Sequence, residues 1–256
     1  MIRIEKLVKK FGDHEVLKQV STQFEAGHTN LIIGRSGSGK TVLLKTIVGL
    51  HEVTSGHVYY GDRDFTQMRQ KERKLLRQEI GMVFQGGALF DSLSVAENVR
   101  FPMDMFTRAS EAEKRARVEF CLDRVNIRRD AFHLSPSEIS GGMQKRVAIA
   151  RAIVLNPKYL FCDEPNSGLD PSTSIVIDKL IHEITQEYNI TTVINTHDMN
   201  SVMEIGDHIL FISEGNNTWE GNRHEILLAE NAKLQEFVFA NPLYKEVRDV
   251  RLKSNS

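Results

Sequence analysis

The chain has 256 residues, 41% of them hydrophobic and 26% charged, which is close to the average of globular proteins. These proportions exclude a collagen-like or wholly disordered chain, and the length allows one large α/β domain or two small ones. The 33 Lys and Arg residues against 34 Asp and Glu residues give a net charge of −1, so no overall basic field would attract nucleic acid.

Cysteine content and hydropathy give two expectations about the compartment. Cys121 and Cys162 are the only cysteines, too few for a disulfide framework, and this fits a reducing environment such as the cytosol. The first residues contain no apolar stretch of signal-peptide length, and no run reaches the roughly 20 apolar residues that cross a bilayer. We therefore expect a cytosolic chain that does not itself cross a membrane.

The first third of the chain predicts strands around one helix. Apolar and polar residues alternate at Ile2 and Ile4 and again over residues 16–24, which indicates antiparallel strands joined by a turn near Gly12. Residues 29–34 predict a buried strand, and residues 41–49 a helix with its apolar side chains on one face. The next expected elements are a strand over residues 56–61, a charged helix within residues 62–79 and a strand over residues 80–84.

The remainder of the chain contains a helical segment and then alternating elements. Residues 85–156 have helical character, so we expect an α-helical subdomain inserted at about residues 86–157. Beyond it, apolar strands alternate with helices, which is typical of a parallel sheet covered on both faces. The strands are expected over residues 159–163, 190–195 and 208–213, and the helices over residues 172–188, 199–205 and from about 222 onward. The predicted fold class is α/β, with a mainly parallel sheet, an N-terminal antiparallel β subdomain and the inserted α-helical subdomain.

A glycine-rich segment follows the strand over residues 29–34. Residues 34–41 match G-x-x-x-x-G-K-[ST] at every constrained position, between a strand and a helix as that motif requires. Its backbone N–H groups and the helix N-terminus would surround an anion. Lys40 would neutralise the β- and γ-phosphates of a nucleotide, and the Thr41 hydroxyl would bind Mg²⁺. The alternative is a glycine-rich turn with a chance lysine.

This motif predicts a P-loop NTPase core. The candidate nucleotide-binding residues of the loop are Gly34, Arg35, Ser36, Gly37, Ser38, Gly39, Lys40 and Thr41.

Two carboxylates follow one another at the end of the strand over residues 159–163. Asp163 would lie beside a nucleotide-bound metal ion, and Glu164 could reach a water aligned on the γ-phosphate. The alternative is an acidic pair at a strand end without a catalytic role. Cys162, in the same strand, is interpreted as an inert core residue.

Two further features narrow the class of protein. Ser140, Gly141 and Gly142 precede a helix and would form a second anion-binding helix N-terminus, which one nucleotide does not need on one subunit. His197 follows the strand over residues 190–195, at the carboxyl edge of the sheet where ligands bind in doubly wound folds. The alternative for His197 is a purely structural role.

Together with Gln85, which follows the strand over residues 80–84, these motifs resemble the nucleotide-binding subunit of ABC transporters over about residues 1–225. The resemblance implies a Mg²⁺-dependent ATPase in which two copies close head to tail around two ATP molecules. Each ATP would lie between the phosphate loop of one copy and residues 140–142 of the other. Residues 1–225 would then be the ATPase domain, and residues 226–256 a C-terminal helical extension.

The resemblance also implies catalytic roles for particular residues. Gln85 would link Mg²⁺ and the attacking water to the helical subdomain, Glu164 would be the general base, and His197 would hold the γ-phosphate. The implied metal ligands are Thr41, Gln85 and Asp163.

Three other positions either match or depart from the family pattern. Phe11 would stack on adenine where the family more often has tyrosine, a small change because stacking needs only the ring. Met143 stands where the family signature usually has glutamine, and the serine and glycines before it are intact. Asp170 would belong to a loop that communicates across the dimer.

The transported molecule is indicated by shorter stretches. In this family the region of residues 85–98 forms a groove for a helix of the membrane subunit, and Leu89, Phe90 and Leu93 would suit that contact or belong to the core. The Gly-Gly-Ala-Leu-Phe sequence at residues 86–90 and the methionine of the signature, with the C-terminal extension, resemble the ATPase subunit of MCE-associated phospholipid transporters.

That resemblance implies an integral membrane permease, an MCE-domain lipid-binding protein and an ATP-dependent homodimer as partners, no nucleic acid, and a peripheral position on the cytoplasmic face of the inner membrane. One alternative is the ATPase of an importer for amino acids or another small polar solute, which shares every catalytic motif. A non-transport ABC ATPase acting on DNA or ribosomes is disfavoured, because the sequence has no basic tract and no long coiled-coil pattern.

Overall fold

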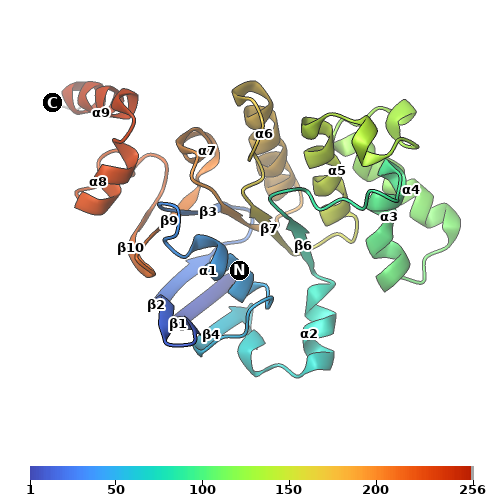
Figure 1. The fold of residues 1–256 in the computed structure, drawn as a ribbon, viewed down its shortest axis with the longest axis horizontal. Coiled ribbons are helices and arrows are strands. Elements are labelled where there is room, and N and C mark those ends of the chain that lie inside the picture. The colour runs from blue at the N-terminus through green and yellow to red at the C-terminus, as the bar shows by residue number, and fades with distance from the viewer. Residues whose placement is uncertain (255–256) are drawn as a thin grey trace. The chain divides into compact units, whose positions relative to one another are not determined.

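The computed structural model describes residues 1–254, and its chain divides into two compact units. The first unit contains Met1–Glu25, Thr29–Thr66 and the residues from Asn195 onward, and the second contains Ala26–His28 and Gln67–Ile194. Figure 1 shows the order of the elements. Within residues 1–254, no helix combines the length and the apolar character needed to cross a bilayer.

The first unit begins with an antiparallel sheet, as the alternating pattern predicted. Strand β1 (Ile2–Phe11) pairs with β2 (His14–Phe24) on one side and with β4 (Ser55–Tyr60) on the other, in the order β2-β1-β4-β5. Ile2 lies opposite both Phe24 and Tyr60, and all three side chains are buried. This sheet confirms the predicted N-terminal β subdomain.

The same unit carries the strands around the phosphate loop. Strand β3 (Thr29–Ile33), whose five residues are all buried, pairs in parallel with β9 (His208–Ser213). Helix α1 (Lys40–Ile47) follows the loop after β3, and α7 (Met199–Ile205) precedes β9. These bounds agree with the expected strand–loop–helix order.

Strand β10 (Asn216–Gly221) is an element that the sequence analysis did not predict. It pairs antiparallel with β9 at the edge of the sheet, so the sheet is parallel with one antiparallel edge. None of its residues is fully buried, and its sequence is rich in asparagine. An edge strand of this kind lacks the run of apolar residues that marks a buried strand.

The expectation of a helix from about residue 222 is wrong for the first ten residues. Helix α8 begins only at Ala232 and ends at Val238, and α9 covers Pro242–Ser254. The Asn231 side chain accepts a hydrogen bond from the backbone N–H of Leu234 at 2.9 Å, which caps α8 and fixes its start. Residues 222–231 form turns, in which Ile226 and Leu227 are nevertheless buried.

The charged helix expected within residues 62–79 is also shorter than predicted. The short strand β5 (Arg63–Asp64) pairs with β4, a single turn of 3₁₀ helix follows at Phe65–Gln67, and helix α2 covers only Gln70–Arg77. Pairing with β4 takes the first residues of the segment out of the helix, because the chain is still completing the antiparallel sheet.

The second unit contains the other parallel strands. Strand β6 (Ile80–Val83) pairs in parallel with β7 (Tyr159–Asp163), and β8 (Thr191–Asn195) follows helix α6 (Pro171–Glu187). Every residue of β7 and β8 is buried, as expected for strands covered on both faces.

Between β6 and β7 lies the predicted helical subdomain, with helices α3 (Val95–Phe106), α4 (Glu111–Arg124) and α5 (Gly141–Ile153). The three helices pack against one another, and Figure 1 shows them gathered together, α3 and α4 in green and α5 in olive. Ser94, Ser110 and Ser140 each accept a hydrogen bond from a first-turn backbone N–H, so all three helices begin where a serine cap permits. The predicted α/β fold class is confirmed.

Candidate functional site

The glycine-rich loop joins β3 to α1 in a conformation that needs its glycines. Gly37 and Gly39 have backbone φ angles of +78° and +109°, a region that side chains disfavour. At Gly34 the constraint is also spatial, because a Cβ atom would lie 2.2 Å from the carbonyl oxygen of Ile212. The loop therefore approaches β9 more closely than any side chain would allow.

Two polar groups of the loop are arranged for an anion. Lys40 is buried, and its Nζ donates hydrogen bonds to the carbonyl oxygens of Gly34 at 2.9 Å and Arg35 at 3.1 Å. The Ser38 hydroxyl is buried and has no hydrogen-bond partner among the described residues. A buried hydroxyl without a partner is unfavourable, and a phosphate oxygen would supply the missing acceptor. The residues present therefore fit a nucleotide phosphate.

Asn195 is a site residue that the sequence analysis read only as the end of a strand. Its Nδ2 donates a hydrogen bond to the Thr41 hydroxyl at 2.9 Å, which orients the candidate metal ligand. The residue is buried at the end of β8. A polar side chain ending a strand of apolar and threonine residues was the available signal.

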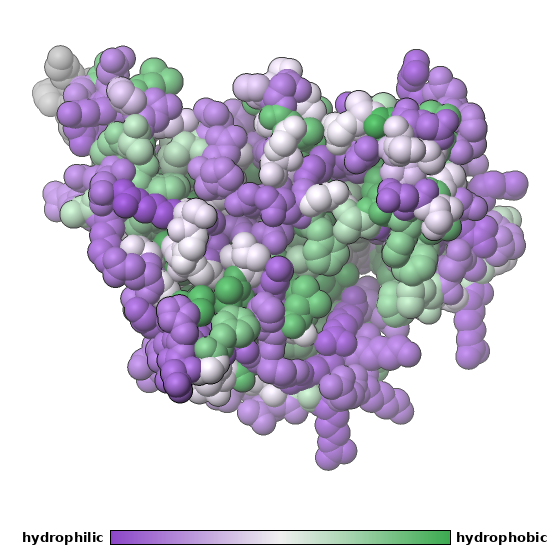
Figure 2. Space-filling view, in the orientation of Figure 1, coloured by the Kyte–Doolittle hydropathy of each residue, from purple (hydrophilic) through white to green (hydrophobic). Residues whose placement is uncertain are grey.

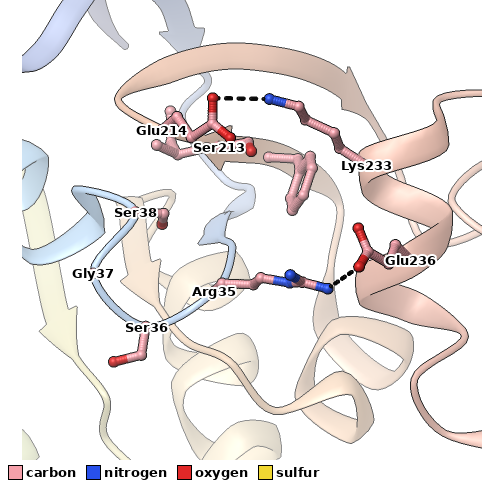
Figure 3. Close-up of a pocket in the computed structure, with 10 residues that line it drawn as sticks. Arg35, Ser36, Gly37, Ser38, Ser213, Glu214, Lys233 and Glu236 are labelled. Carbon is pink, nitrogen blue, oxygen red and sulfur yellow. Dashed lines mark ion pairs between the residues drawn. The ribbon is translucent and has the colours of Figure 1, made fainter.

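A cavity of about 250 Å³ lies on one side of the phosphate loop, and Figure 3 shows its lining. Arg35 of the loop forms an ion pair with Glu236 of α8 at 2.7 Å, and Lys233 of α8 pairs at 3.0 Å with Glu214 in the turn between β9 and β10. Helix α8 thus contacts the loop through the Arg35–Glu236 ion pair. These side chains are more than half exposed, so solvent screens both pairs and they are weak evidence for stability.

Phe11 and His197, the two candidate ligand-binding residues outside the loop, are both exposed side chains of the first unit. Phe11 ends β1 with 46% of its surface exposed, and its ring lies edge-on to His51 with 5.2 Å between ring centroids. His197 follows β8 and precedes Asp198, which caps α7 by accepting the backbone N–H of Asn200 at 2.8 Å. Both are accessible to a ligand.

In the second unit, the structure brings Glu164 and Gln85 together. Asp163 is the buried last residue of β7, and Glu164 follows it in a left-handed backbone conformation with a φ of +46°. The side-chain Nε2 of Gln85 donates a hydrogen bond to Glu164 Oε2 at 3.2 Å and another to Ser167 Oγ at 3.3 Å. A residue other than glycine in this conformation is strained by about 1–3 kcal/mol, and such strain concentrates at functional sites.

The second predicted anion site is the start of α5. Ser140 caps the helix by accepting the backbone N–H of Met143 at 3.3 Å. Gly141 is exposed, whereas a Cβ atom on Gly142 would lie 2.8 Å from Thr173 Cγ2. Gly141 thus leaves this helix end exposed, and Gly142 allows it to pack closely against Thr173.

Asp170 has a local structural role in addition to any role in a dimer. Its carboxylate caps α6 by accepting the backbone N–H of Thr173 at 3.0 Å, and it accepts both the Ser172 and Thr173 hydroxyls at 2.5 Å. The hydroxyl of Ser172, followed by that of Thr173, lowers the pKa of Asp170 well below its usual value. Asp170 is therefore ionised at neutral pH.

The apolar residues at 89–93 are not core residues. Phe90 is 41% exposed, with its ring centroid 4.7 Å from that of Phe101, and Leu89 and Leu93 are partly exposed. Phe84, just before Gln85, is also exposed. Apolar side chains interrupt an otherwise largely hydrophilic face in Figure 2.

The fold and the phosphate loop define a P-loop nucleotide-binding protein. The sequence profile of the family described as ABC transporter matches residues 17–167. The chain belongs to this family, and it is an ATP-binding, ATP-hydrolysing subunit of a transporter.

Relatives with assigned transport roles match nearly the whole chain. The methionine import ATP-binding protein MetN of Campylobacter jejuni is 38% identical in an alignment 255 residues long, which covers 93% of this chain and 75% of that protein. The intermembrane phospholipid transport system ATP-binding protein MlaF of Haemophilus influenzae is 34% identical over 238 residues, covering 93% of this chain and 90% of that protein.

Solved structures agree with the fold. The ATP-binding cassette MJ0796, in a dimeric post-hydrolysis state bound to ADP and Pi, superposes with a TM-score of 0.79 at 32% identity and covers 87% of this chain and 99% of its own. The cbiO1 protein of Clostridium perfringens, part of the transporter complex cbiONQ, gives a TM-score of 0.83 at 30% identity and covers 98% of both chains. The resemblance to the ABC nucleotide-binding subunit is confirmed.

Proposed function

We propose that two copies of this chain hydrolyse ATP with Mg²⁺ between them and so drive a membrane permease that moves phospholipid. The observation that carries the catalytic part is the hydrogen bond from Gln85 to the Glu164 carboxylate, directly after the buried strand β7. A carboxylate fixed in this way, at the end of a strand that also supplies Asp163, is placed to accept a proton from water. Glu164 is accordingly the general base.

The phosphate loop binds the ATP phosphates through its backbone N–H groups, the Lys40 ammonium and the Ser38 hydroxyl. Lys40 exchanges the carbonyls of Gly34 and Arg35 for phosphate oxygens. Phe11 stacks on the adenine ring, and His197 holds the γ-phosphate. These assignments rest on the motif positions and on the exposure of both aromatic side chains.

Magnesium suits the oxygen donors that these positions supply, namely a hydroxyl, an amide and a carboxylate. Thr41, Gln85 and Asp163 are the residues that would hold it. When bound, Mg²⁺ neutralises phosphate charge that develops during transfer. Asn195 keeps the Thr41 hydroxyl in place by donating to its oxygen.

The dimer follows from the second anion site. Residues 140–142 form the N-terminus of a helix that the nucleotide of the same copy does not require, and a solved relative is described as a dimer. Each ATP then lies between the loop of one copy and Ser140, Gly141 and Gly142 of the other. Such an arrangement is an isologous pair with two-fold symmetry.

The permease contact is assigned to the exposed apolar residues that follow β6, above all Phe90. The chain is then a peripheral subunit on the cytoplasmic face of the inner membrane, with residues 1–225 as its ATPase domain, about 86–157 as the helical insertion, and 226–256 as an extension. The sequence at 86–90, Met143 and the phospholipid-transport relative favour phospholipid as cargo and an MCE-domain protein as the further partner.

The cargo is tested by purifying the Glu164→Gln variant from native membranes in ATP and mild detergent, with mass spectrometry of the proteins and lipids that accompany it. A multi-span permease, an MCE-domain protein and phospholipid are the expected companions. The Lys40→Ala variant, which cannot close around ATP, serves as the matched control. A permease recovered with a soluble binding protein and no MCE-domain protein would contradict phospholipid transport.

A second candidate is the ATPase of an amino-acid importer. It is favoured by the methionine-import relative, whose 38% identity is higher than the 34% of the phospholipid-transport relative. Stimulation of turnover by an amino acid with its soluble binding protein in reconstituted vesicles would support this candidate.

A further inference from the structure

The segment after β6 is held to helix α5 by two cationic side chains. Lys145 Nζ donates a hydrogen bond to the carbonyl oxygen of Gln85. The Arg151 guanidinium donates to the carbonyl oxygens of Gly87 at 2.6 Å and Ala88 at 2.7 Å. Residues 85–88 therefore present three backbone acceptors to one helix.

Lys145 is unusual because it is a buried cation, with only 6% of its surface exposed. Burial lowers the pKa of Lys145, and the Gln85 carbonyl replaces water that the ammonium has lost. Burying a cation is costly, and the hydrogen bond to the Gln85 carbonyl offsets only part of that cost. Its position is better explained by what it holds in place.

A continuous series of bonds runs from Lys145 to the catalytic carboxylate. The ammonium holds the backbone of Gln85, and the side chain of the same glutamine donates to Glu164 at 3.2 Å. The negative charge of Glu164 also acts to raise the pKa of Lys145, against the larger effect of burial. Helix α5, which carries Lys145, begins at Gly141, so the helix that anchors Gln85 is also the helix whose N-terminus forms the second anion site.

We propose that Lys145 is a positioning residue that fixes Gln85 relative to Glu164 and thereby links the N-terminus of α5 to the hydrolytic centre. The inference rests on the proposed function, in which Glu164 is the general base and residues 140–142 bind the partner's ATP. A shift of α5 when ATP is bound at its N-terminus would move the Gln85 backbone with it. Arg151 holds Gly87 and Ala88, so residues 85–88 would move as one piece with helix α5.

The first test replaces Lys145 with methionine, which fills the buried space without a donor. We expect kcat for ATP hydrolysis to fall at least about tenfold, because a small misplacement of a catalytic group is costly. The KM for ATP should stay within about threefold, since the phosphate loop is unchanged. Lys145→Arg restores a donor and should recover most of the lost rate. The thermal midpoint of Lys145→Met should fall by no more than about 4 °C, the loss expected for one missing hydrogen bond.

Arg117→Met is the matched control. Arg117 lies on α4 and donates to the carbonyl oxygens of Ile153 and Val154 at 2.8 and 2.9 Å, at the opposite end of α5. This variant removes a cation that holds the other end of α5 without touching Gln85, so kcat should stay within about twofold of the wild-type value.

A double-mutant cycle separates positioning from general damage. Gln85→Ala keeps the backbone carbonyl but removes the side chain through which Lys145 would act. In that background, Lys145→Met should lower kcat by less than about twofold. An equal loss in both backgrounds, or a Lys145→Met variant with the wild-type rate, would overturn the proposal. Failure of the proposed function would look different, because Glu164→Gln would then retain full turnover.

Discussion

The side-chain amide of Gln85 donates a hydrogen bond to the carboxylate of Glu164, with 3.2 Å between Nε2 and Oε2. The two residues follow strands β6 and β7, which pair in parallel with Val83 opposite Cys162. Neighbouring parallel strands deliver the residues after them to the same sheet edge, and ligand sites form at that edge. Strand pairing therefore explains how residues 79 positions apart come within hydrogen-bond distance of each other.

Glu164→Gln should abolish turnover while leaving ATP binding intact. The amide cannot accept a proton, and losing a general base lowers kcat by about 10²–10⁴-fold. The variant should still associate in the presence of ATP, which light scattering would detect, while phosphate release reports turnover. Glu183→Gln, on the exposed face of α6, is the control and should have the wild-type rate. An unchanged rate in Glu164→Gln would remove the assignment of the base.

Lys40→Ala should abolish ATP binding. The buried ammonium is held by the carbonyl oxygens of Gly34 and Arg35, so it is already in the loop before the nucleotide arrives. Its removal eliminates the loop's buried positive charge, and isothermal titration should detect no binding. Lys45→Ala, further along the same helix, should bind normally. Retained affinity in Lys40→Ala would contradict the role of the phosphate loop.

Gly34→Ala should destabilise the first unit. A Cβ atom at this position would lie 2.2 Å from the carbonyl oxygen of Ile212, which is too close for van der Waals contact. Overpacking of this kind lowers the free energy of unfolding by about 1–3 kcal/mol, measurable by urea titration. Gly86→Ala has open space around the added methyl group and should unfold as the wild type does. Equal stability of the two variants would show that β9 can shift to accommodate the added methyl group.

Asn98→Ala should loosen residues 90–94. The buried Asn98 side chain accepts the backbone N–H of Phe90 at 2.8 Å and donates to the carbonyl oxygens of Phe90, Leu93 and Ser94 at 3.0–3.1 Å. Leaving these groups without partners lowers stability by about 1–3 kcal/mol. Hydrogen exchange should accelerate at residues 90–94, and Asn98→Asp, which also buries a charge, should be worse still. Unaltered exchange would mean that residues 90–94 keep their structure without the Asn98 side chain.

Both cysteines should be unreactive in the folded protein. Burial raises the pKa of the Cys121 thiol to about 11, and burial also raises that of Cys162. At pH 8 only about one Cys121 thiol in a thousand is then ionised, and neither sulfur is exposed. Iodoacetamide should modify them only after unfolding, as mass spectrometry can establish. Rapid modification of native protein would contradict the buried positions.

The sequence predicts elements whose ends or apolar character are clearly marked. Strand β7 has the predicted bounds because it is a continuous buried run, and helix α7 because Asp198 and Gly206 mark its two ends. Strand β10 was missed because its residues are partly exposed and polar. The start of α8 was placed too early because residues 223–230 are mostly good helix formers although they lie in turns, and the cap Asn231 comes only after them.

The site was predictable where its residues are contiguous in the sequence. Residues 34–41 form one loop, so their spacing alone indicates phosphate binding. The bonds from Asn195 to Thr41 and from Lys145 to Gln85 could not be predicted in the same way, since each joins residues from distant parts of the chain. Such pairs depend on strand order and helix packing, which periodicity does not specify.

The burial of the Cys121 and Cys162 thiols has a practical consequence. Any cysteine introduced on the surface, for example at Ser137, would be the single sulfur open to a maleimide reagent. The unaltered chain is thus already suited to site-specific attachment of a fluorophore or spin label. Labelled copies mixed with ATP would report on their mutual approach and separation in real time, through each cycle of nucleotide use.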